Sequence, residues 1–92
     1  FAGVAVANLD EEVRGKLHID DKVDSGAVVT GIERDSAAAR AGLRPGDVVV
    51  QLDRKPVKDA AEFRALAAKA DDKSSLLLVA RKGGTMFVLV KK

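Results

Sequence analysis

The chain has 92 residues, of which 47% are hydrophobic and 33% charged, and its net charge is +2. This length predicts one domain with one modest core, and the apolar content excludes an intrinsically disordered segment. The sequence contains no cysteine, which excludes disulfides, thiolate zinc sites and a cysteine nucleophile. No stretch approaches the roughly 20 apolar residues of a membrane-spanning helix. With aromatic residues at 3%, base stacking on nucleic acid is not expected either.

The first third of the chain predicts two strands separated by a short helix. Residues 4–7 are an apolar run that is typical of a buried or edge strand. Residues 10–17 begin with acidic and end with basic side chains, which suits the helix dipole and predicts a short helix. A polar loop follows over residues 19–25. Residues 26–32 are rich in β-branched side chains and predict the second strand.

The central segment predicts a capped helical turn, a tight turn and a third strand. Ser36 can cap a short helix over residues 37–41, and Gly42, which accepts a positive φ, can end it. Pro45-Gly46 fits positions i+1 and i+2 of a type II turn. The expected third strand and the turn after it cover residues 48–52 and 53–56, and Val57 can continue as a very short strand.

The last third predicts the longest helix and a strand hairpin. Asp59 can cap a helix over residues 60–70, and one face of that helix carries Phe63, Leu66, Ala67 and Ala70. Residues 76–80 suit a central strand, residues 82–85 a hairpin turn and residues 86–90 the returning strand. A small twisted sheet or partial barrel with helices over its open sides would bury all these apolar faces.

Residues 36–50 resemble the signature of PDZ domains. A small-residue helical turn leads into Ala41-Gly42-Leu43, two variable residues, Gly46-Asp47 and an apolar strand. The later elements follow at similar spacing, so the resemblance covers nearly the whole chain. It implies an α+β, PDZ-like fold of about five strands and two helices, with the circularly permuted strand order of HtrA/Do-like serine proteases. The chain most resembles their second, C-terminal PDZ domain, so we expect residues 1–92 to be a single PDZ domain from a longer protein.

The resemblance also implies a site between the first strand and the longest helix. A PDZ domain adds a peptide to a sheet edge as an extra strand, and backbone N–H groups of a glycine-containing loop hold its C-terminal carboxylate. In this sequence the implied loop is Ala2, Gly3 and Val4, the implied strand is Ala5, Val6 and Ala7, and the implied helix residues are Ala60, Phe63, Arg64 and Ala67. Two alternatives stay open: residues 1–7 can be an edge strand that pairs with another domain, and Arg64 can be a solvated side chain instead of a contact for an acidic peptide residue.

The implied function is that of a non-catalytic, peptide-binding regulatory module in a periplasmic Do/HtrA-like serine protease. Its partners would be C-terminal or unfolded peptide segments, the protease domain and sister subunits, with no cofactor, metal, nucleic acid or membrane insertion. An alternative is an assembly module. In that case a docking patch would comprise Leu9, Val13, Leu17 and Ile19, unless these residues close the domain's own core. A third alternative is the PDZ domain of another protease or of a secretion component.

The residues themselves do not predict catalysis. A Ser-His-Asp triad needs a serine and a carboxylate near the single histidine, His18, and an oxyanion hole. No serine has the Gly-x-Ser-x-Gly context of a nucleophile. Ser36 is better explained as a helix cap and His18 as a surface residue, and one histidine without cysteine disfavours a transition-metal site.

Overall fold

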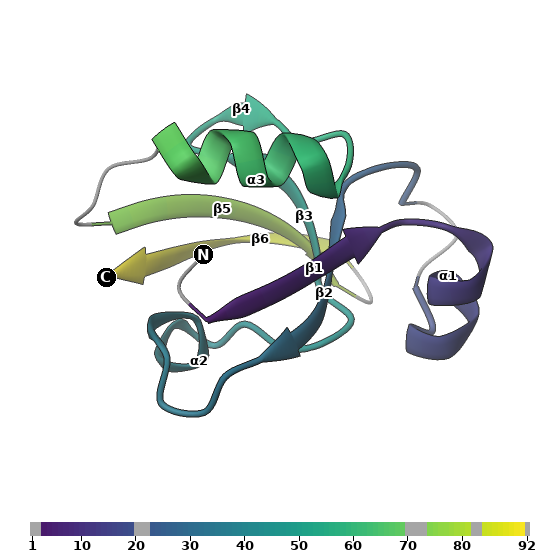
Figure 1. Cartoon of the computed structure of the whole chain (residues 1–92), viewed down its shortest axis with the longest axis horizontal. Coiled ribbons are helices and arrows are strands. Elements are labelled where there is room, and N and C mark those ends of the chain that lie inside the picture. The colour runs from purple at the N-terminus through teal and green to yellow at the C-terminus, as the bar shows by residue number, and fades with distance from the viewer. Residues whose placement is uncertain (1–2, 20–22, 70–73, 82–83, 92) are drawn as a thin grey trace.

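A computed structural model describes residues 3–19, 23–69, 74–81 and 84–91, which form six strands and three helices (Figure 1). The strands are β1 (Val4–Asn8), β2 (Ala27–Ile32), β3 (Val48–Leu52), β4 (Lys55–Pro56), β5 (Ser74–Arg81) and β6 (Gly84–Lys91). The helices are α1 (Glu11–Leu17), α2 (Ala37–Ala41) and α3 (Ala60–Lys69). None of these helices is long and apolar enough to cross a membrane.

One antiparallel sheet contains all six strands in the order β1-β2-β3-β5-β6, and β4 pairs with β3 beside this path. β5 lies between β3 and β6, which confirms the prediction of a central strand there. β1 and β6 are the two edges. In Figure 1, α3 lies at the top of the molecule and α2 at the bottom, and α1 stands apart beyond the end of β1.

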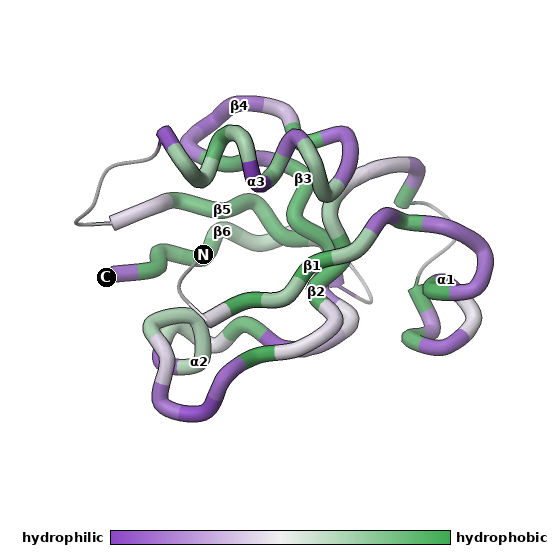
Figure 2. The backbone as a smooth tube through the Cα atoms, viewed as in Figure 1, coloured by the Kyte–Doolittle hydropathy of each residue, from purple (hydrophilic) through white to green (hydrophobic). Residues whose placement is uncertain are grey.

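The main core lies between the sheet, α2 and α3. It comprises Ala27, Val29, Ala38, Leu43, Val49, Leu52, Val57, Phe63, Leu77, Val79, Val88 and Val90. Figure 2 shows the hydrophobic strands converging at the centre of the molecule, with hydrophilic segments in the turns and helix ends. Phe63 is 1% exposed and is the largest of the fully buried side chains. Its position confirms that this side of α3 faces the core, although Ala70 of the predicted face lies outside the described residues.

A second, smaller cluster covers the other face of the sheet. Successive side chains of a strand point to opposite faces, so Val28 and Val48 point away from the main core that Val29 and Val49 enter. Ile19, Val28, Val48 and Ala80 form this cluster, with Leu9, Val13, Leu17, Val23 and Val50 packed against it. Leu9, Val13, Leu17 and Ile19 therefore pack on the domain's own second core, which was the alternative to a docking patch.

Local capping explains where the helices begin. Asp10 accepts a hydrogen bond from Val13 N at 2.8 Å, so α1 begins at Glu11 with its N-cap one residue earlier. Ser36 caps α2 through Ala39 N at 3.1 Å, and Asp59 caps α3 through Glu62 N at 2.8 Å. These bonds satisfy backbone donors that have no partner within the helix. The predictions for Ser36 and Asp59 are confirmed.

Two predicted turns are shorter than expected. The turn after β3 needs only Asp53 and Arg54, both at positive φ, so Lys55 and Pro56 pair with Leu52 and Gln51 as β4. The prediction of a turn over residues 53–56 is therefore wrong in its second half. Residues 84 and 85, which were also predicted as turn, pair with β5 at the start of β6, and residues 82–83 lie outside the described residues.

Candidate functional site

β1 pairs with β2 along one side and leaves its other side unpaired. Val6 lies opposite Val29, whose N–H and C=O bond to Asp47 O and Gly46 N, both 2.8 Å away on the β3 side. The pair of Val6 and Val29 is therefore of the non-hydrogen-bonded kind. It follows that the backbone N–H and C=O of Val6 point away from β2.

The start of β1 shows the same orientation. Gly3 O accepts a hydrogen bond from Glu33 N at 2.8 Å, so this carbonyl points into the sheet. The C=O and the following N–H of a trans peptide point in opposite directions. The N–H of Val4 therefore points out of the sheet, on the same unpaired side as the backbone groups of Val6.

α3 lies along this unpaired side and runs antiparallel to β1 (Figure 1). Asn8 Oδ1, at the end of β1, accepts a hydrogen bond from Ala60 N, at the start of α3, at 2.9 Å. One turn further along α3, Arg64 Nη2 donates to Val6 O at 3.2 Å. We call the unpaired edge of β1, together with Ala60, Arg64 and Ala67 on α3, the β1–α3 seam.

The predicted site residues divide into core and surface positions. Val4 and Val6 are half-buried and pack against the main core, as does Ala67, while Ala5 and Arg64 are exposed. Phe63 is buried in the main core, and Ala60 is buried within the seam itself. Ala7 is half-buried on β1. Ala2, the first residue of the predicted carboxylate loop, lies outside the described residues.

Gly3 is held in a conformation that only glycine adopts easily. Its φ is +85°, and a Cβ added there would lie 2.4 Å from the Cβ of Ser36. Both the positive φ and the close approach exclude a side chain. The backbone that leads into β1 therefore rests directly on the residue that caps α2.

The segment that carries the PDZ-like signature shapes the local fold through two glycines and a buried carboxylate. Gly42 ends α2 at a φ of 95°, and Gly46 has a φ of 97° in a turn closed by a 3.1 Å bond from Asp47 N to Arg44 O. This geometry fits the predicted type II turn. Asp47 is 4% exposed and also accepts a hydrogen bond from Arg44 N at 2.9 Å.

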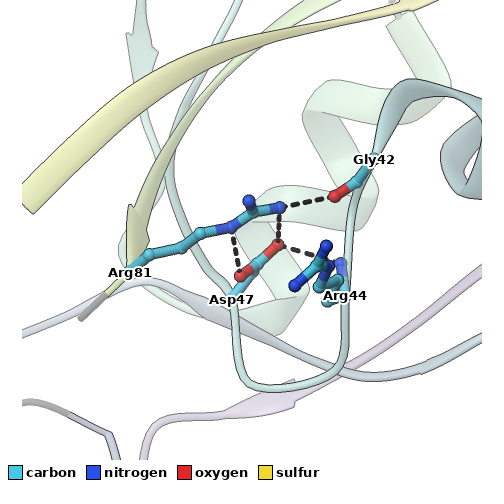
Figure 3. Close-up of polar contacts among 4 residues, drawn as sticks. All are labelled: Gly42, Arg44, Asp47 and Arg81. Atoms are coloured by element: carbon cyan, nitrogen blue, oxygen red, sulfur yellow. Dashed lines mark hydrogen bonds and ion pairs between the residues drawn. The ribbon is translucent and has the colours of Figure 1, made fainter.

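Sequence reasoning missed the partner of Asp47. Arg81 at the end of β5 donates from Nε to Oδ1 and from Nη2 to Oδ2, both at 2.8 Å, and Nη2 also reaches Gly42 O (Figure 3). The hydrogen bond with Asp47 raises the pKa of Arg81 above its ordinary value, so the guanidinium stays charged. The pair ties the signature loop to the sheet.

His18 and Ser36, the residues considered for catalysis, both lie at helix ends. His18 is exposed and ends α1 with a φ of 54°, and Ser36 is engaged as a helix cap. Across the described ranges, no group of three or more His, Asp or Glu side chains could hold a metal ion. The predictions of a surface histidine and a capping serine are confirmed.

A family model described as a PDZ domain matches residues 28–82, which is more than half of the chain. The chain belongs to the PDZ domain family. PDZ domains are non-catalytic modules, and the predicted PDZ-like fold is confirmed.

Sequence relatives of this PDZ domain are HtrA- and DegP-like serine proteases. A Pseudomonas putida protein named a probable periplasmic serine endoprotease DegP-like is 34% identical over 90 residues, which are 97% of this chain and 18% of the relative. A Staphylococcus epidermidis serine protease HtrA-like is 27% identical over 88 residues, which are 94% of this chain and 15% of the relative. The PDZ domain thus spans less than a fifth of these relatives.

Solved structures show the same architecture. The structure of the HtrA-type protease AlgW with a decapeptide matches 99% of this chain and 28% of its own, with a TM-score of 0.81 and 29% identity. The HtrA3 PDZ domain bound to a phage-derived ligand matches 99% of this chain and 82% of its own, with a TM-score of 0.81 and 21% identity. The resemblance to PDZ domains of HtrA-like proteases is confirmed.

Proposed function

We propose that this PDZ domain binds the C-terminal tails of proteins by adding them as a strand to β1. The observation that carries the proposal is the orientation of β1: the N–H of Val4 and the N–H and C=O of Val6 point away from β2. Strand addition uses such backbone groups for affinity and neighbouring pockets for specificity. The N–H groups of Ala2, Gly3 and Val4 would hold the terminal carboxylate, and residues 5–7 would pair with the preceding peptide residues.

The helix side of the seam supports the same function. Ala67 is small and half-buried beside the main core, which leaves room for a sizeable apolar side chain at the peptide terminus. Two structural neighbours, AlgW and the HtrA3 PDZ domain, were solved with a peptide or ligand bound. These similarities support peptide binding as the activity of this domain.

The relatives suggest the protein in which this domain works. We assign it as a regulatory module of an HtrA/Do-like serine protease of the cell envelope, whose protease domain and sister subunits are further partners. Several relatives are named periplasmic endoproteases, and others come from Staphylococcus. The cell envelope is the location that accommodates both groups.

An NMR titration tests the proposal. The isolated domain is titrated with free-carboxylate peptides and with the same peptides as C-terminal amides. The backbone N–H signals of residues 3–7 and 60–67 should shift with the acids and stay in place with the amides. If neither set shifts these signals at millimolar peptide, or if both shift them equally, capture of a terminal carboxylate is wrong.

A second candidate function, assembly with another subunit, is favoured by the surface of β6. Phe87 is 60% exposed, Leu89 48% and Met86 43%, and they lie on the edge strand opposite β1. Phe87 and Leu89 alternate with the buried Val88 and Val90, so they point away from the main core. Sedimentation over a range of concentrations tests this function: self-association that Phe87→Gln reduces would support it, and a monomer at every concentration would oppose it.

A further inference from the structure

One polar contact crosses the β1–α3 seam at its middle. Arg64 is exposed on α3, and its guanidinium reaches back to β1, where Nη2 lies 3.2 Å from Val6 O. Within the described part of the chain, no carboxylate forms an ion pair with Arg64, and Val6 O is its hydrogen-bond partner. A charged side chain therefore occupies the carbonyl on the unpaired edge.

This carbonyl is one that an added strand would use. A peptide lying along β1 places a backbone N–H opposite Val6 O, at the position where the Arg64 guanidinium now donates. The peptide must therefore displace Arg64 before the strand pairing is complete. The displaced guanidinium keeps its five N–H donors and fits a carboxylate best, through two parallel hydrogen bonds.

No described carboxylate of the seam would compete with a peptide carboxylate for Arg64. Residues 4–7 carry only alanine and valine side chains, and the other two α3 positions of the seam are Ala60 and Ala67. The nearby carboxylates of α3 are engaged elsewhere: Glu62 accepts from Lys58 N, and Asp59 caps the helix. A peptide carboxylate at this place would meet one positive charge and no described negative charge of the seam.

We propose that a bound peptide breaks the hydrogen bond from Arg64 to Val6 O, and that Arg64 then selects an acidic side chain in the peptide. We call this hydrogen bond the latch. The proposal rests on the proposed function and specifies its ligand. The terminal carboxylate is held near Val4, and Val6 lies two residues further along an antiparallel pairing. The selected Asp or Glu is therefore the third residue from the peptide's C-terminus, whose side chain lies on the same side as that of Val6.

The first test uses two peptides that differ only in Glu or Gln at the third position from the C-terminus. The wild-type domain should bind the Glu peptide about two- to fivefold more tightly, the range of an exposed ion pair. Arg64→Ala should remove this difference and bind the Gln peptide more tightly than the wild type does, because Val6 O is free. Calorimetric titration measures all four affinities.

Lys69→Ala is the matched control, because it removes one exposed positive charge from the same helix at a residue with no described contact to β1. The preference for Glu should survive this change. Equal binding of both peptides by the wild type overturns selection. So does a preference that Arg64→Ala keeps, or one that Lys69→Ala removes as fully.

The latch itself has a readout that needs no peptide. In the free domain, the carbonyl ¹³C signal of Val6 should move when Arg64 becomes alanine and stay in place in Lys69→Ala. An unchanged Val6 signal in Arg64→Ala overturns the latch. If the wild type binds neither peptide while this signal moves, strand addition fails and the contact between Arg64 and β1 stands.

Discussion

At the scale of single residues, Arg54 occupies a backbone conformation to which it is poorly suited. Asp53 and Arg54 form the two-residue turn between β3 and β4 with φ angles of 50° and 70°. Turns of this kind favour glycine at the second position. Asp53 gains from its place, since it accepts a 2.8 Å bond from Leu76 N, while no hydrogen bond of the Arg54 side chain is found among the described residues.

Arg54→Gly should therefore raise the free energy of unfolding by about 0.5 kcal/mol, because relief of the left-handed strain outweighs the entropy that glycine adds to the unfolded chain. Urea denaturation measures the change. Lys55→Gly is the control: Lys55 is extended in β4, so glycine there should lower the stability by about 0.5–1 kcal/mol. A loss of stability in Arg54→Gly would contradict the prediction.

Arg81→Ala should lower the stability by about 2–3 kcal/mol. The change leaves the nearly buried Asp47 carboxylate without its two-pronged partner, and the cost falls below that of a fully buried pair because the Arg81 side chain is 28% exposed. Since the pKa of Arg81 is raised, the guanidinium stays charged wherever the domain is folded, and alkaline titration will not mimic the variant.

Arg44→Ala is the control for Arg81, because Arg44 contacts Asp47 through its backbone N and not through its side chain. Its stability should stay within about 0.5 kcal/mol of the wild type, as for most surface substitutions. Thermal unfolding of both variants at neutral pH gives the comparison. Equal losses would show that nearby positive charge, and not the hydrogen-bonded pair, stabilises the loop.

At the scale of elements, Asn8 joins β1 to α3. Its side chain satisfies Ala60 N, one of the donors at the start of α3 that has no partner within the helix. Asn8→Ala should lower the stability by about 1 kcal/mol, as for the loss of a helix cap, and should weaken peptide binding because α3 loses its tie to β1.

Asn8→Asp keeps the acceptor and adds a negative charge at a helix N-terminus, so it should restore both stability and binding. Chemical denaturation and peptide titration of the two variants measure the effect. If aspartate is as damaging as alanine, the bond between Asn8 and Ala60 does not hold the two elements together.

The elements were predictable where their signals are local. β3 was predicted with its observed bounds because Gly46 and Asp53 mark turns on either side of an apolar run. β4 was missed because Pro56 disfavours strands, although a strand beside the main path of the sheet tolerates it. The bounds of β5 and β6 were predicted too short, because polar Ser74 and Thr85 pair through their backbones in a hairpin longer than its apolar segments.

The site was predictable only in part. The order of elements and the PDZ resemblance place β1 beside α3 without any coordinates. The resemblance also singles out Arg64 on the helix, but its hydrogen bond to Val6 O depends on the conformation of a long side chain, which the sequence does not specify. The bond between Arg81 and Asp47 joins residues 34 positions apart, so no local pattern could have predicted it.

At the scale of the whole molecule, the sheet has a core on each of its faces. Val49 enters the main core and Val48 the second cluster, and both are at most 1% exposed. If the two clusters unfold as one unit, Val48→Ala and Val49→Ala should each cost about 2 kcal/mol and keep a single transition.

Circular dichroism and one-dimensional NMR, followed through the same urea series, test whether the transitions coincide. A separate early transition in Val48→Ala, with the signals of α1 lost first, would show that the second cluster is an independent layer. Coincident transitions would show that α1 is part of the folding unit.

The contact between Gly3 and Ser36 makes position 3 sensitive to the chirality of the residue placed there. The φ of +85° and the short distance to Ser36 both exclude the side-chain position of an L-residue, so an L-alanine there would distort the loop before any effect on a ligand could be seen. A D-residue prefers a positive φ and carries its methyl group in place of the other glycine hydrogen. A chain of 92 residues is within reach of chemical ligation, and D-alanine at position 3 would stiffen the proposed carboxylate loop, whereas ribosomal mutagenesis can only disrupt it.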